Sequence, residues 1–255
     1  MLKILGLGNS FSWDATTYLD RIAGDLYVRN LHIGGCSLEG HVDKIRNKKA
    51  WYEFQAQGVK IGEKTVSAND IIASEDWDYI TITSTPGQEG NPKFYEGCLD
   101  GLIAFLRANM TNPEAQIGYH MTWAFPDGSP SSAMRLHNNS RTQMFNDIVD
   151  TTQNHIMKKY DVDFLLASGT AVENARSSLG QVFTKEDGYH MNTYGEYVTG
   201  YMYFAALTGK PLNELKFKPN YISETSRTII ARAVNAALHD PFAETDLKSD
   251  PVFLD

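Results

Sequence analysis

Short apolar segments alternate with longer amphipathic ones along most of the chain, and this alternation constrains the fold more than any other feature. The apolar segments are typical of β-strands, and they cover residues 3–7, 26–33, 77–83, 116–124 and 164–167. The segments with helical periodicity cover residues 12–22, 92–110, 133–160, 193–207 and 224–238, and a short helix is expected after Gly169-Thr170. Strands that alternate with helices favour a parallel sheet with helices on both faces. We therefore predict an α/β fold, a three-layer α/β/α sandwich with a central parallel sheet.

The chain length of 255 residues suits one domain, and we assign residues 1–255 to it. Residues 44–70 carry several aromatic side chains without a clear period. We interpret them as an irregular excursion or small hairpin that lies outside the main sheet. A polar tail is expected over residues 240–255.

Each predicted strand is followed by a loop rich in turn-forming residues. These loops cover residues 8–12, 34–41, 86–90, 123–132 and 169–176. In open parallel sheets, ligands bind beyond the carboxyl ends of the strands. We therefore expect the five loops to share one rim of the sheet, and a functional site to lie there.

The charge balance argues against one class of function. Lys and Arg total 23 against 31 for Asp and Glu, so the net charge of −8 disfavours a broad nucleic-acid-binding surface. A membrane-spanning helix needs an apolar run of about 18 residues or more, and the sequence contains none. The oligomeric state stays open at this point.

The two cysteines and the N-terminus say little about the compartment. Cys36 and Cys98 are too few for a disulfide framework or a cysteine-rich zinc site, and whether they pair is left open. We expect no metal and no cofactor. The apolar stretch after Met1 is too short for a secretory signal. The protein is therefore cytoplasmic if Met1 is native, and periplasmic or secreted if a signal peptide has been removed.

Three residues at opposite ends of the chain suggest nucleophilic chemistry. Ser10 follows the first strand in a Gly-Asn-Ser turn, which places a hydroxyl at the sheet rim. Asp187 and His190 lie three residues apart in a glycine-containing loop. A carboxylate at this spacing can accept from Nδ1–H of the histidine and leave Nε2 free to take a proton. A serine hydroxyl is a poor nucleophile without such a base.

These segments resemble the sequence blocks of the SGNH (GDSL-like) hydrolases. Residues 8–12, GNSFS, resemble the first block, with Asn9 where Asp is usual. The Gly34-Gly35 pair stands where the second-block glycine stands, and Asp187-Gly-Tyr-His190 resembles the last block. The third block, normally Gly-x-Asn-Asp, is replaced by PGQEG at residues 86–90, which puts Gln88 in place of the Asn. GGCSLEGH and DGYHMN further resemble an uncharacterised, GNSFS-type bacterial subgroup.

The resemblance implies a flavodoxin-like sandwich and a serine esterase with a Ser10–His190–Asp187 triad. The oxyanion would be held by backbone N–H groups of Ser10 and Gly35, with the side-chain amide of Gln88 as a third donor. Removing one such donor typically costs about 100- to 1000-fold in rate. Because Gln88 and Asn9 depart from the family pattern, a catalytically silent, carbohydrate-binding protein on this fold remains the alternative.

Aromatic residues near the predicted rim favour a carbohydrate ester as substrate, since flat rings stack on sugars. The candidate substrate-binding residues are Trp13, His41, Trp123 and Tyr189. We favour removal of an acetyl group from a carbohydrate. A lipid or small-ester hydrolase is the alternative within the enzymes.

Most of these residues also have a purely structural interpretation. Ser10 suits a helix cap, and Asp187 could cap the helix that begins near Asn192. Asp14 fits the first turn of a helix, and we prefer that interpretation. The remaining histidines are interpreted as structural or surface residues; they are His32, His120, His137, His155 and His239.

Overall fold

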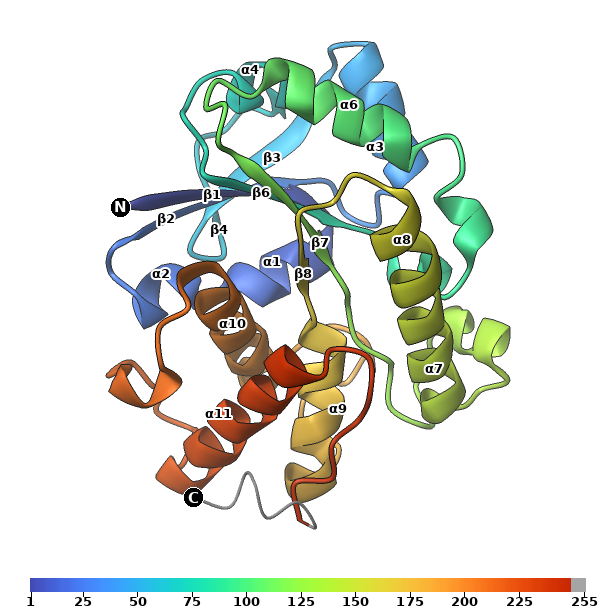
Figure 1. The fold of residues 1–255 in the computed structure, drawn as a ribbon, viewed down its shortest axis with the longest axis vertical. Helices are drawn as coiled ribbons and strands as arrows, with labels where there is room; N and C mark the ends of the chain where they lie inside the picture. The colour runs from blue at the N-terminus through green and yellow to red at the C-terminus, as the bar shows by residue number, and fades with distance from the viewer. Residues whose placement is uncertain (249–255) are drawn as a thin grey trace.

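Apolar residues form the strands of a central sheet in the structure, a computed structural model that describes residues 1–248 (Figure 1). The described strands are β1 (Leu2–Gly8), β2 (Leu26–His32), β3 (Ala50–Ala56), β4 (Val59–Lys60), β5 (Val66–Ser67), β6 (Tyr79–Thr83), β7 (Gln116–His120) and β8 (Phe164–Leu166). Their order is β4-β3-β2-β1-β6-β7-β8, with β5 paired to β3. The pairs from β2 through β8 in this order are parallel. The central strand β1 is buried on both faces, and Ile4, Leu5 and Leu7 are fully inaccessible to solvent.

Helices cover both faces of the sheet, which makes a three-layer α/β/α sandwich (Figure 1). One layer contains α3 (Leu38–Arg46), α4 (Ala68–Ile72), α6 (Leu99–Asn109), α7 (Arg141–Thr151) and α8 (Met157–Lys159). The other contains α1 (Ser10–Thr16), α2 (Leu19–Ile22), α9 (Ser168–Leu179), α10 (Thr193–Thr208) and α11 (Glu224–His239). Short elements complete the rim and connections: α5 (Pro86–Glu89), η1 (Pro92–Phe94), η2 (Ser132–His137), the π-turn η3 (Thr152–Ile156) and η4 (Leu212–Glu214). The predicted fold class is confirmed.

The prediction that residues 44–70 lie outside the main sheet is wrong. Strand β3 pairs antiparallel with β2, where Leu31 faces Phe54, so one edge of the sheet is mixed. The burial of β3 does not alternate, and its register shifts near Tyr52, which is fully buried. Because the two-residue period of a half-buried strand is missing, no strand could be predicted there from the pattern of residues.

Three predicted elements are shorter in the structure because specific residues interrupt them. The helix expected over residues 92–110 breaks at Gly97, whose φ of 74° is left-handed. The helix expected over residues 133–160 is interrupted by Asn138 and Asn139, both with positive φ. The strand expected over residues 116–124 ends at His120. The Met121 N–H still donates to Leu166 of β8, but the Thr122 N–H donates to the Glu89 carboxylate instead of to a strand.

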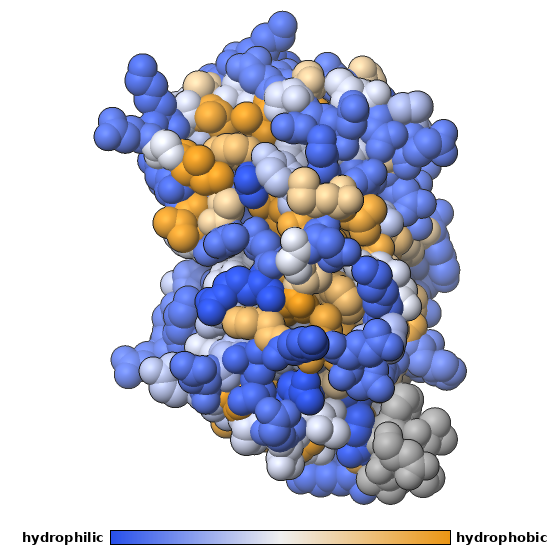
Figure 2. Space-filling view, turned by 90° about the vertical axis from the view of Figure 1, so that its left-hand side faces the viewer, coloured by the Kyte–Doolittle hydropathy of each residue, from blue (hydrophilic) through white to orange (hydrophobic). Residues whose placement is uncertain are grey.

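The face at the amino ends of the strands carries hydrophobic residues in several groups separated by hydrophilic ones (Figure 2). The residues after α11 pack back onto α9, since the Thr245 N–H donates to the Asn174 side chain and Leu247 is buried. Residues 249–255 of the expected tail, and of the expected single domain, lie outside the described part. No helix within residues 1–248 is long and apolar enough to cross a membrane. Cys36 and Cys98 are both buried and free.

Candidate active site

Ser10 is held at the carboxyl end of β1 by the side chain of Asn9. The Asn9 Oδ1 accepts from the Phe11 N–H at 3.0 Å, so Asn9 and not Ser10 caps α1. The Asn9 Nδ2 donates to the carbonyl oxygens of Cys36 (3.3 Å) and Ser84 (3.1 Å). Asn9 therefore ties together the segments that follow β1, β2 and β6, and Ser10 becomes the first residue of α1.

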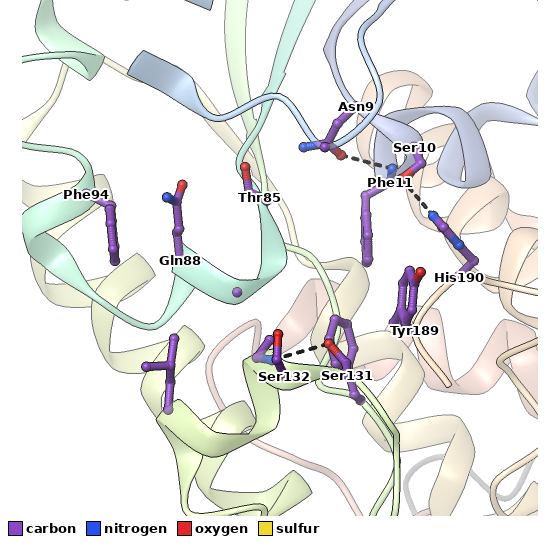
Figure 3. A pocket seen from close by; sticks show the side chains of 15 residues that line it. Asn9, Ser10, Phe11, Thr85, Gln88, Phe94, Ser131, Ser132, Tyr189 and His190 are labelled. Carbon is purple, nitrogen blue, oxygen red and sulfur yellow. Dashed lines mark hydrogen bonds between the residues drawn. The ribbon is translucent and has the colours of Figure 1, made fainter. Parts of the chain in front are cut away.

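The late loop brings a histidine to this serine (Figure 3) and a carboxylate to that histidine. The Oγ of Ser10 lies 2.8 Å from Nε2 of His190, and Nδ1 of His190 lies 2.8 Å from Oδ2 of Asp187. The structure thus brings together the three residues predicted to form a triad, although Ser10 and His190 are 180 positions apart. Asp187 does not cap the following helix, because Asn192 caps α10.

Backbone hydrogen bonds keep Asp187 charged and correctly oriented. Its Oδ1 accepts from the N–H groups of Tyr189 and His190, both at 3.0 Å. Partial burial raises the pKa of Asp187, but these two hydrogen bonds and the His190 ring outweigh it, so the pKa lies below its ordinary value. An ionised carboxylate accepts from Nδ1–H and leaves Nε2 of His190 as an acceptor for the Ser10 hydroxyl.

Asp14 connects the helix that carries Ser10 to the loop that carries His190. Its Oδ2 accepts from the Met191 N–H at 2.8 Å, and its Oδ1 lies 3.7 Å from the Lys185 ammonium. Burial raises the pKa of Asp14 above its ordinary value, although Lys185 and the Met191 N–H act in the opposite direction. Sequence reasoning assigned Asp14 only to a helix turn, and no local pattern could have predicted a contact 177 positions away.

Two residues at the rim have backbone N–H groups free to bind a ligand. Ser10 and Gly35 both line the cavity, and the N–H group of neither donates to another residue of the described chain. Gly35 has a φ of 62°, a conformation that favours glycine. Gln88 also lines this cavity, but its side chain extends from α5 on the side opposite Ser10 and His190 (Figure 3). The hydroxyl of Thr85, the residue before α5, donates to the Cys36 carbonyl at 3.0 Å.

Two of the four predicted substrate-binding residues line cavities at the site, and two do not. Trp13 and Tyr189 line cavities next to His190. His41 is fully buried and its Nδ1 lies 2.9 Å from the Tyr52 hydroxyl, so it cannot touch a ligand as predicted. Trp123 is also fully buried; it stacks on Phe11 and donates from Nε1 to the Tyr189 carbonyl at 2.8 Å. We therefore correct both to residues that support the site from behind.

Further residues at the site were missed by sequence reasoning. His32 packs edge-on against Trp13 and pairs with Glu53 at 3.1 Å, in a cavity that also reaches Ser10. Phe94 and Leu136 line a second cavity, the one that Gln88 and Tyr189 also line. Their chain positions carry no local motif, so only the folded arrangement identifies them. The described residues contain no group of three or more His, Cys, Asp or Glu side chains that could hold a metal ion.

Comparisons with known proteins agree with this architecture. A crystal structure of a DUF4886 family protein from Bacteroides uniformis superposes with a TM-score of 0.91 at 29% identity, over 97% of this chain and 98% of that chain. A protein described as a candidate SGNH hydrolase of Slackia heliotrinireducens gives 0.55 at 17% identity, over 81% and 98%. The acetylxylan esterase Axe2 of Geobacillus stearothermophilus gives 0.50 at 11% identity, over 81% and 94%. At such low identities the last two show the fold alone, and no curated protein matches this sequence.

A family model also matches most of the sequence. Residues 3–239 match a family described as a domain of unknown function, DUF4886. The fold is SGNH-like, and the match spans β1 through the end of α11. The chain therefore belongs to the DUF4886 family.

Proposed function

We propose that this protein is a serine hydrolase that cleaves carboxylic esters through an acyl-enzyme intermediate. The observation that carries the proposal is the hydrogen-bonded chain from Ser10 Oγ through His190 to Asp187, with both distances at 2.8 Å. The chain opens into a cavity of about 610 Å³, so a substrate can reach the hydroxyl. The SGNH-like fold agrees with this chemistry, because the three residues come from the same rim of the sheet.

In the first half of the reaction, the Ser10 oxygen attacks the ester carbonyl carbon while its proton moves to Nε2 of His190. The tetrahedral oxyanion accepts hydrogen bonds from the backbone N–H groups of Ser10 and Gly35. Collapse of this intermediate breaks the bond to the alcohol oxygen, and His190 gives its proton to the departing alcohol. Asp187 stabilises the transient imidazolium and remains ionised throughout.

In the second half, water replaces the alcohol. His190 takes a proton from the water, whose oxygen attacks the acyl-enzyme carbonyl. The second tetrahedral intermediate then releases Ser10, which recovers its proton from His190, and the carboxylic acid leaves. Gln88 lies across the cavity, so we assign the oxyanion to the two backbone donors and give Gln88 a place in the cavity wall.

A carbohydrate ester remains our preferred substrate, with a lipid or other small ester as the alternative. The half-buried Trp13 beside His32 offers a flat apolar surface next to polar groups, which suits a sugar. We had favoured acetyl as the acyl group, but the cavity of about 610 Å³ is much larger than an acetyl group.

The test is turnover of p-nitrophenyl acetate by the wild-type protein and by Ser10→Ala. We expect Ser10→Ala to lose at least about 10³-fold in kcat/KM, because the nucleophile is gone while the fold is kept. Ser74→Ala is the matched control. Ser74 is exposed in the segment before β6, at the amino ends of the strands, whereas Ser10 lies at their carboxyl ends. Thermal unfolding of the three proteins checks that each is folded.

Equal rates for the wild type and Ser10→Ala overturn the proposal. Binding of oligosaccharides by a folded wild type without any Ser10-dependent turnover supports the catalytically silent carbohydrate-binding alternative instead.

A further inference from the structure

Two cavities of similar size meet at Ser10, Gly35 and His190. The first has a volume of about 610 Å³, and the second about 590 Å³. We call them the apolar cavity and the charged cavity after the side chains that line them. Because both reach the nucleophile and the base, an ester bound at Ser10 would place its acyl group in one and its alcohol in the other.

The apolar cavity is walled by aromatic and aliphatic side chains. Phe125 and Leu136 line it, and it extends from Phe11 and Tyr189 near the serine to Phe94 on the far side (Figure 3). Phe94 is 41% exposed and Leu136 is 65% exposed, so two large hydrophobic side chains of its wall are in contact with solvent. Exposed apolar side chains that rim a cavity commonly mark a surface for an apolar ligand.

The charged cavity lies on the side of the loop that carries His190. Lys185 belongs to this loop, and its ammonium is 3.7 Å from Asp14 and 3.8 Å from Glu196. Trp13 and His32 complete its wall. The ion pairs are longer than a good hydrogen bond, so these groups keep donors and acceptors for a polar ligand.

The direction of proton transfer decides which part of the ester lies where. The departing alcohol oxygen must receive its proton from Nε2 of His190, so the alcohol belongs on the histidine side, next to Lys185 and Glu196. The acyl group then points away from His190, toward Phe94. We propose that the apolar cavity binds an acyl group longer than acetyl and that the charged cavity binds a neutral polyhydroxy alcohol such as a sugar. This inference rests on the proposed function, because it names the substrate of the same site.

Two observations narrow the ligand classes. An acetyl group would fill only a small part of a cavity of about 610 Å³. Burial and the nearby Asp14 carboxylate raise the pKa of Glu196 to about 7, which reduces the negative charge of the charged cavity near neutral pH. With Lys185 present as a cation, this favours a neutral polyol over a cationic alcohol.

The acyl half is tested with p-nitrophenyl acetate, hexanoate and decanoate. Each methylene buried contributes about three- to fourfold in kcat/KM, so we expect hexanoate to exceed acetate by at least about tenfold. Leu136→Ser and Phe94→Ser should lower the hexanoate-to-acetate ratio by about threefold or more. The matched control is Leu238→Ser, because Leu238 is 42% exposed on α11 and lines neither cavity.

The alcohol half is tested with a glucose monohexanoate and ethyl hexanoate, which share one acyl group. We expect a higher kcat/KM for the glucose ester, and Lys185→Ala should reduce this preference by about threefold or more. Lys210→Ala is the matched control, because the Lys210 side chain is 55% exposed, close to the 50% of Lys185, and is also paired to a carboxylate, that of Asp25.

The outcomes separate this inference from the proposed function. Ser10-dependent hydrolysis that is faster on acetate than on hexanoate, or no faster on the glucose ester than on the ethyl ester, overturns the inference and leaves the esterase standing. An exchange of effects, in which Leu136→Ser alters the alcohol preference and Lys185→Ala the chain length, overturns the assignment of the cavities. Absence of Ser10-dependent turnover on every ester overturns the proposed function itself.

Discussion

Two histidine–carboxylate pairs in this molecule have nearly the same geometry and different surroundings. Nδ1 of His190 is 2.8 Å from Asp187, and Nδ1 of His137 is 2.6 Å from Asp147. The His190 side chain is 27% exposed and its Nε2 meets Ser10, whereas the His137 side chain is 4% exposed and its Nε2 has no partner among the described residues. The pair alone therefore does not make a relay. A nucleophile at Nε2 and an open cavity distinguish the site.

The His137–Asp147 pair supports one side of the apolar cavity from behind. His137 ends η2, which carries Leu136, and its ring lies so close to Gly90 that a side chain there would come within 2.7 Å of it. The neighbouring Glu89 is fully buried and accepts from the Tyr119 hydroxyl and from the Thr122 N–H. We call His137, Asp147 and Glu89 the sealed cluster. It fixes α5 against η2, so it shapes the cavity without facing it.

The largest expected effect is that of His190→Gln. Glutamine cannot accept the Ser10 proton, so kcat/KM for p-nitrophenyl acetate should fall by at least about 10³-fold, with little change in thermal stability. His137→Gln provides the contrast and should keep kcat within about fivefold of the wild type, because it faces no nucleophile. Similar losses of activity in both variants would erase the distinction between the two pairs.

A smaller loss is expected for Asp187→Asn. The amide can donate to His190 and so favour the tautomer that cannot accept from Ser10, which should lower kcat by about 10²- to 10⁴-fold while KM changes little. Steady-state kinetics on one ester measure both constants. A variant with the wild-type kcat would show that Asp187 does not orient the histidine.

Titration of Glu89 in the sealed cluster should change the free energy of unfolding with pH and leave the pH dependence of activity unchanged. Burial raises the pKa of Glu89 to about 7, although hydrogen bonds from Thr122 and Tyr119 oppose this. The folded protein then holds a proton that the unfolded chain releases above about pH 4.3, so this group's contribution to stability falls as the pH rises from there to about 7, by up to about 3 kcal/mol in total. Urea unfolding of wild type and Glu89→Gln at pH 5 and pH 7 measures it, and the variant should lose less stability over this range. An equal loss in both proteins contradicts the assignment.

The smallest effect separates the two aspartates by stability. Asp147→Ala leaves the buried Nδ1 of His137 without its acceptor and should cost about 1 to 2 kcal/mol of unfolding free energy, because Asp147 itself is partly exposed. Asp187→Ala should cost less than about 1 kcal/mol, since water can reach the half-exposed His190. Chemical denaturation measures both values. A larger loss for Asp187→Ala than for Asp147→Ala would mean that the Asp187–His190 pair is structural and the Asp147–His137 pair is not.

Part of this molecule is predictable from local sequence. Most strands and the α10 and α11 helices follow from periodicity, and the placement of Ser10 at the rim follows from parallel strand order. The placement of His190 beside it was predicted from the Asp187–His190 spacing and the resemblance to the SGNH hydrolases. Strand β3 could not be predicted because its burial does not alternate. The His137–Asp147 pair could not be predicted because the two residues lie in different elements. His41 and Trp123 were predicted to bind substrate because nothing local reveals that a rim residue points inward. The missing information is which side chains meet across the fold.

The most direct test of the central claim is the stoichiometry and position of labelling by a fluorophosphonate. Attack by the Ser10 oxygen on phosphorus expels fluoride and leaves a stable adduct, which peptide mass mapping locates. The account predicts one adduct per chain on Ser10, none in Ser10→Ala, and strongly slowed labelling in His190→Gln. An adduct that persists in Ser10→Ala, or labelling of the wild type at another residue, would contradict it.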